Sequence, residues 1–142
     1  MSETTQASQA TRPRKEFRNI SVPQILSYRL PLAGRLSILH RVSGALLFLA
    51  LPIVLLPLFQ LSVASPESFE QFRSFAAHPL SKLVFLVLIW AYLHHFCAGI
   101  RYLLLDLHIG MSKESGKRSA GIVFAVSLVL TAVFALKLFG AF

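Results

Sequence analysis

The chain has 142 residues, of which 55% are hydrophobic and 14% are charged, and its formal net charge is +8. This composition is too apolar for an ordinary small soluble domain and indicates an integral membrane protein. The charge does not indicate a nucleic-acid partner, because seven of the fourteen basic residues precede Val42, beside the first apolar segment. Such an excess is typical of the cytoplasmic flanks of membrane helices. The single cysteine, Cys97, excludes an intrachain disulfide.

Residues 1–31 are predicted to form a cytoplasmic N-terminal segment without a signal peptide, since they stay polar for too long. The first twelve or so are rich in Ser, Thr and Gln, and we expect them to be disordered. Residues 17–31 carry apolar anchors between two prolines. Two interpretations stay open for this stretch: a tether at the membrane interface, or a docking segment for a soluble partner.

Three segments are long and apolar enough to cross a bilayer, which takes about 20 residues. They comprise residues 32–61, 80–107 and 120–142. They predict an all-α membrane protein with three transmembrane helices. Pro52 and Pro57 lie in the outer half of the first segment and should kink or end its helix nearby.

The two connections between the spans differ in charge. Residues 62–79 hold one basic residue and a predicted short amphipathic helix capped by Ser65, which would lie on the outer membrane surface. Residues 108–119 form a predicted polar turn with three basic residues. The asymmetry predicts that the N-terminus and the second connection are cytoplasmic and that the C-terminus is outside.

The first group of polar residues in a span comprises Ser37, His40, Arg41 and Gly44, near its cytoplasmic end. Ser37, Arg41 and Gly44 share one helix face at i, i+4, i+7 spacing. A hydroxyl, an imidazole and a guanidinium there could hydrogen-bond a quinone carbonyl or pair with carboxylates. Alternatively, His40 and Arg41 only reach toward the lipid head groups, and Gly44 permits close helix packing.

The second group lies in residues 80–107 and centres on His95, about 16 Å along the helix from Asp106. Ionisable groups at such depth usually face a bundle interior, a cofactor or a water-filled cavity. His95 shares a stripe with Gly99 and Tyr102, and Gly99 would leave room for a flat macrocycle. His95 could ligate a haem iron, relay a proton or hydrogen-bond across helices. For His94, on another face, an interhelical hydrogen bond is the favoured interpretation.

His40 and His95 are not expected to bind one iron together. Counting along the helices puts His40 a turn or so below the cytoplasmic surface and His95 about three turns below it, an offset of roughly 10 Å. That offset suits a haem whose iron meets His95 and whose propionates point toward His40 and Arg41. A second axial ligand would then come from another chain. Any haem would be non-covalent, because the chain has no CxxCH motif.

The motif LSILHRVSG at residues 36–44, followed by HxxxGIRxxxxD at residues 95–106, resembles the cytochrome b556 subunits of succinate dehydrogenase, or complex II, over nearly the whole chain. The resemblance implies that His95 is one axial ligand of a haem b shared with a small membrane anchor subunit in a heteromeric helical bundle. It places Ser37 and Arg41 at the ubiquinone site, and His40 and Arg41 near the haem propionates. Where the family usually has His or Phe, this chain has Tyr102, so a propionate contact there would use a phenol.

The resemblance further implies an anchor for a flavoprotein and an iron–sulfur subunit at a bacterial inner membrane, which is favoured over the mitochondrial one. Electrons from succinate would pass to ubiquinone there. Succinate oxidation is expected in the flavoprotein, because nothing in this chain resembles a dicarboxylate site, a flavin fingerprint or an iron–sulfur cysteine set. The alternatives are a quinol:fumarate reductase subunit, a haem-free anchor and a structural membrane adaptor. A self-contained di-haem cytochrome needs four level ligands, which the five histidines do not offer.

Overall fold

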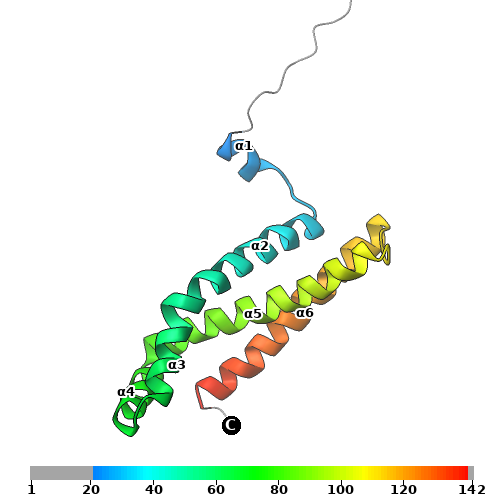
Figure 1. Ribbon diagram of the computed structural model, residues 1–142. Coiled ribbons are helices and arrows are strands. Elements are labelled where there is room, and N and C mark those ends of the chain that lie inside the picture. Colours follow the sequence, from blue (N-terminus) through cyan, green and yellow to red (C-terminus); the bar gives the residue numbers. More distant parts are fainter. Residues whose placement is uncertain (1–20, 141–142) are drawn as a thin grey trace, which may run out of the picture.

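The computed structural model describes residues 21–140, and its long elements are all helices. In chain order they are α1 (Val22–Ser27), α2 (Leu32–Ala50), the π-helical η1 (Leu51–Leu55), α3 (Leu56–Val63), α4 (Pro66–Ala77), α5 (Pro79–Asp106) and α6 (Lys113–Leu138). Figure 1 shows α5 running between α2 and α6. The disorder predicted for the first twelve residues lies outside the described residues.

Three helical segments are long and apolar enough to cross a membrane, namely Leu32–Val63, Pro79–Asp106 and Lys113–Leu138. The predicted all-α class with three potential spans is therefore confirmed. Large apolar side chains point away from the bundle on all three segments, and Phe48, for example, is 76% exposed. Outward apolar surface of this kind suits contact with lipid rather than water.

Mostly small or polar side chains line the faces along which α2, α5 and α6 pack. Apart from Ser81 near the start of α5, the buried positions recur at intervals of three, four or seven residues, so each helix presents one narrow stripe to its neighbours. They are Leu36, Ser43 and Ala50 on α2, Ala91, His94, Ala98 and Arg101 on α5, and Ala120, Val123 and Ser127 on α6. This stripe lets the helices approach closely, and it fixes which residues of each motif face the interior.

The two prolines of the first span do not end it. Residues Leu51–Leu55 form a π-turn, in which the Leu56 N–H bonds to the Leu51 carbonyl, and the chain continues directly into α3 (Figure 1). The wider turn redistributes the backbone bonds around Pro52, which has no N–H to donate. The first span therefore remains helical to Val63.

Helix α4 begins at a reciprocal cap. The Ser65 hydroxyl accepts from the Ser68 N–H at 3.1 Å, and the Ser65 N–H donates to the Ser68 hydroxyl at 2.9 Å. This arrangement satisfies two backbone groups at the helix start. Helix α4 packs against α3 and α5, so the short helix in the first connection is part of the fold.

Helix α6 begins at Lys113, earlier than the third span predicted to start at Ala120. The Ser112 hydroxyl accepts from the Ser115 N–H at 3.2 Å and caps the helix, with Glu114 in its first turn. The prediction that residues 108–119 form a turn was therefore wrong for their second half. Ser and Gly residues commonly form turns, but here Ser112 acts as an N-cap and the charged residues behind it favour helix.

Candidate functional site: a histidine pair between two helices

The central feature of the site is a stack of two imidazole rings between α2 and α5. The ring centroids of His40 and His95 lie 4.2 Å apart, with 13° between the ring planes. The ring of Tyr102, two turns after His95 on α5, lies 5.0 Å from that of His40. Three of the predicted site residues thus meet at one place, although they come from motifs more than fifty residues apart in sequence.

The predicted depth offset between His40 and His95 was wrong. Helix α2 begins at Leu32, eight residues before His40, and α5 ends at Asp106, eleven residues after His95. The remaining difference of three residues corresponds to only about 4.5 Å along a helix. A tilt of the helices and the reach of two side chains span that distance. The two rings still cannot bind one iron from opposite faces of a macrocycle, because they lie face to face against each other.

The Nδ1 atom of His95 is tied to the backbone of α2. It lies 3.0 Å from the carbonyl oxygen of His40 and 3.4 Å from the hydroxyl of Ser43. Gly44 makes this approach possible, because a Cβ at that position would lie 2.8 Å from Cε1 of His95. The opposite ring nitrogen of His95, Nε2, is neither enclosed nor hydrogen-bonded to any described residue.

His94 occupies a different environment one residue earlier on α5. Its side chain is fully buried, its ring stacks on Trp90 at 5.4 Å and tilts against Phe124 at 5.4 Å, and its Nδ1 lies 3.5 Å from the Ser127 hydroxyl. Its Nε2 is enclosed without a partner among the described residues. The geometry fits the interhelical role favoured by the sequence and leaves no open approach to a ring nitrogen.

The structure places Ser37 and Arg41 one helical turn apart on α2, with Ser37 half-buried and Arg41 exposed. Neither residue is part of the ring stack, but Arg41 directly follows His40 and Ser37 lies one turn before it. The polar groups of the first motif therefore lie within two turns of one another in the first half of α2.

Gly99 faces a side chain of α2. A Cβ added there would lie 3.8 Å from the Nε2 of His40, an ordinary contact distance. That Nε2 is itself enclosed and has no hydrogen-bond partner in residues 21–140. The space that Gly99 leaves open is thus filled by His40 in this structure.

Arg101 is a polar residue of the second motif whose role was not predicted from the sequence. Its side chain is 7% exposed and joins α5 to α6. Its Nε donates to the Ser119 hydroxyl at 2.9 Å and its Nη2 donates to the Gly116 carbonyl at 3.3 Å. Its guanidinium also lies 5.4 Å from the centre of the Tyr102 ring. In the sequence, its spacing of seven residues from His94 indicates this buried position, because both residues lie on the buried stripe of α5.

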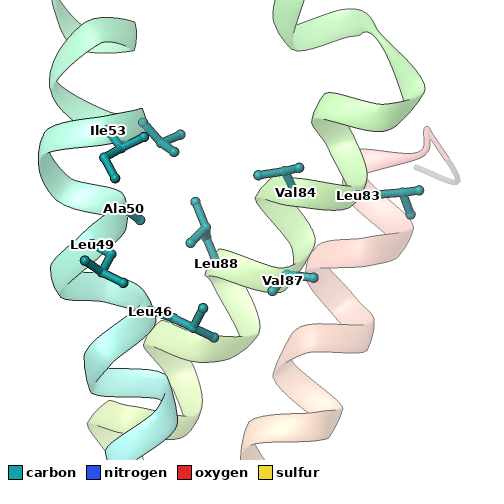
Figure 2. A pocket seen from close by; sticks show the side chains of 9 residues that line it. Leu46, Leu49, Ala50, Ile53, Leu83, Val84, Val87 and Leu88 are labelled. Carbon is teal, nitrogen blue, oxygen red and sulfur yellow. The ribbon is translucent and has the colours of Figure 1, made fainter.

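An apolar groove lies between α2–η1 and α5, away from these polar groups. Figure 2 shows side chains of both helices facing it, and it has a volume of about 410 Å³. Its lining consists of Leu46, Leu49, Ala50, Ile53, Val54, Leu83, Val84, Val87 and Leu88. With no polar side chain in its wall, the groove offers no group for proton transfer or metal binding.

The described fold is that of a multi-pass helical membrane protein with a polar site between two of its potential spans. Residues 14–134 match the family described as the succinate dehydrogenase/fumarate reductase transmembrane subunit. The match covers far more than half of the chain, and the chain therefore belongs to this family. The family resemblance carried by the two motifs is confirmed.

The chain also matches individual relatives over most of its length. It is 37% identical to the succinate dehydrogenase cytochrome b556 subunit of Coxiella burnetii over 106 residues, which cover 74% of this chain and 84% of that protein. Proteins of the same name match from Paracoccus denitrificans, at 32% identity over 84% of this chain and 91% of that protein, and from Rickettsia felis, at 29% identity over 77% and 84%.

Proposed function

We propose that the chain is the haem b-binding membrane anchor of a succinate dehydrogenase and forms part of its ubiquinone reduction site. The observation that carries this proposal is the orientation of His95. Its Nδ1 is held by α2, and its Nε2 is not fully enclosed and has no hydrogen-bond partner among the described residues. The relatives are named cytochrome b556 subunits, and a b-type cytochrome holds haem through side-chain ligands of this kind.

The residues around the ring stack fit a haem. His95 would hold the iron through Nε2, and the small anchor subunit would supply a second ligand. His40 has an enclosed Nε2 without a partner, and a propionate carboxylate would accept its hydrogen bond. Arg41 would add positive charge beside that carboxylate, and Tyr102 would offer a hydroxyl. When bound, the haem supplies a one-electron carrier within the membrane.

Ser37 and Arg41 would bind the quinone. Arg41 is exposed on α2, where its guanidinium can stabilise negative charge that develops on a quinone oxygen. Ser37, half-buried on the preceding turn, would donate a hydrogen bond to a carbonyl oxygen. A hydroxyl alone is a poor proton source, so water or a residue of a partner subunit would complete proton delivery.

The anchor role requires partners on the cytoplasmic side. The polar residues of the first motif lie near the N-terminal end of α2. The basic residues of the N-terminal segment and of the start of α6 would lie on the same side of the membrane. An iron–sulfur subunit and a flavoprotein would dock there and deliver electrons from succinate. The relatives named as succinate dehydrogenase subunits favour this direction over fumarate reduction.

The experiment compares two activities of the assembled complex. Ser37→Ala and Arg41→Leu should reduce succinate:ubiquinone activity by at least tenfold and leave succinate oxidation with a soluble artificial acceptor within about twofold of wild type, because only the quinone site is altered. Ser62→Ala and Arg73→Leu, at the other end of the first span and in α4, are the matched controls and should change neither activity. Unchanged quinone reduction in both test variants would refute the quinone assignment.

A further inference from the structure

We infer that the His40 carbonyl, Ser43 and Gly44 of α2 form a cradle that fixes the tautomer and the electron-donor strength of His95. These residues are positioning residues: they act on the iron through His95 and not by touching it. The inference rests on the proposed haem-binding role of His95. It assigns to the backbone and small residues of the first motif a function separate from quinone binding and propionate contact.

The tautomer follows from the partner of Nδ1. A carbonyl oxygen can only accept a hydrogen bond, so the 3.0 Å contact between His95 Nδ1 and the His40 oxygen places the proton on Nδ1. In a neutral imidazole the lone pair then lies on Nε2, which has no hydrogen-bond partner among the described residues and is not fully enclosed. The backbone of α2 thus selects the nitrogen that can bind a metal.

Ser43 competes for the same carbonyl. Its hydroxyl is fully buried and donates to the His40 oxygen at 3.0 Å, while its oxygen lies 3.4 Å from His95 Nδ1. Two side-chain donors therefore converge on one acceptor. Each weakens the bond of the other, because they share the electron density of one oxygen. Ser43 thereby limits how strongly His95 donates.

Gly44 sets the distance between the His95 ring and the His40 carbonyl. A Cβ at this position would lie 2.8 Å from Cε1 of His95, closer than real Cβ contacts allow, and 3.2 Å from Nδ1, a tight contact. Any larger residue would push the ring away from the His40 carbonyl. The requirement is specific to this glycine, since a Cβ at Gly34 on the same helix would meet only Pro31 and Leu30 at 3.6–3.7 Å.

The strength of the Nδ1 hydrogen bond tunes the metal. A histidine that donates a stronger hydrogen bond from Nδ1 is a more basic ligand, and a more basic ligand favours the oxidised iron. Ser43→Ala removes the competing donor, so it should strengthen the bond and lower the haem reduction potential. Gly44→Ala displaces the ring, so it should weaken the bond and raise the potential.

The test is a redox titration of the haem in the purified complex, followed by visible absorbance. Wild type, Ser43→Ala, Gly44→Ala and the control Gly34→Ala are compared, and the low-spin electron paramagnetic resonance signal is recorded for each. Shifts of opposite sign in the first two variants, with Gly34→Ala at the wild-type potential, support the cradle. General loosening of the bundle would move both variants in one direction and would overturn it, as would no shift in either. Should Gly44→Ala fail to assemble, the sign for Ser43→Ala decides: a lower potential supports the cradle, and an unchanged or higher one overturns it.

The same series separates this inference from the proposed function. A complex with His95→Ala that keeps an unchanged low-spin haem would refute the ligand assignment itself. A haem that depends on His95 but keeps its potential in Ser43→Ala and Gly44→Ala would refute only the cradle.

Discussion

His94 and His95 are consecutive residues of α5, yet their rings lie in different parts of the molecule. His94 is enclosed among aromatic residues of α5 and α6, with Nδ1 3.5 Å from the Ser127 hydroxyl. His95 lies against α2, stacked on His40 and hydrogen-bonded to its carbonyl. The step of about 100° between neighbouring helix positions produces this division. Both ring nitrogens of His94 are thus inside the bundle, whereas the Nε2 of His95 is not fully enclosed and has no partner among the described residues.

His94→Ala should destabilise the complex without removing its haem. The substitution would leave a cavity between α5 and α6 and would remove one of two hydrogen-bond partners of the Ser127 hydroxyl, at a cost of about 2–5 kcal/mol. Thermal unfolding of the detergent-solubilised complex should show a lower midpoint. The control is Phe96→Ala, since Phe96 is 54% exposed on the outer face of α5 and should have a smaller effect. Loss of haem from a stably assembled His94→Ala complex would contradict this division of roles.

Arg101 should stabilise the α5–α6 pair. Arg101→Ala would remove the donor to the Ser119 hydroxyl and one of two side-chain donors to the Gly116 carbonyl, which also accepts from Ser119, and the cost should be about 1–3 kcal/mol. Arg101→Lys should recover only part of it, because an ammonium lacks the planar fork that reaches both acceptors. Thermal unfolding measures the difference, with the exposed Arg118→Ala on α6 as the control. If all three variants unfolded at the same temperature as wild type, the hydrogen bonds of Arg101 to α6 would contribute nothing to stability.

The membrane topology can be tested with reporters. The excess of basic residues before the first span predicts a cytoplasmic N-terminus and an external C-terminus. A periplasm-dependent reporter fused after Phe142 should be active, and the same reporter inserted at Gly110, in the turn between α5 and α6, should be inactive. The reversed pattern would mean that the orientation of all three spans is inverted.

The sequence allowed the spans and the faces of the motifs to be predicted, but not how the helices meet. Hydrophobic periodicity places His95, Gly99 and Tyr102 on one stripe because that relation lies within a single helix. The level of His40 relative to His95 depends on where each helix begins and how it tilts. Both depend on packing between helices, and counting along one chain segment does not give them.

Arg101 and the start of α6 were missed for related reasons. The donors of Arg101 find their acceptors on another helix, so no local pattern specifies the pair. The Ser and Gly residues near Ser112 have two common roles, as turn formers and as helix caps. Only the charged residues that follow Ser112 favour a helix. Their preference for helix is small compared with the preference of the nearby glycine against it.

The most direct test of the central claim is the reduced-minus-oxidised visible spectrum of the purified complex, recorded for wild type, His95→Ala and His94→Ala at equal protein concentration. We expect a b-type haem spectrum in wild type and in His94→Ala, and its loss or a change of spin state in His95→Ala. An unchanged low-spin spectrum in His95→Ala would show that His95 is not the ligand, and loss of the spectrum only in His94→Ala would move the ligand to the buried histidine.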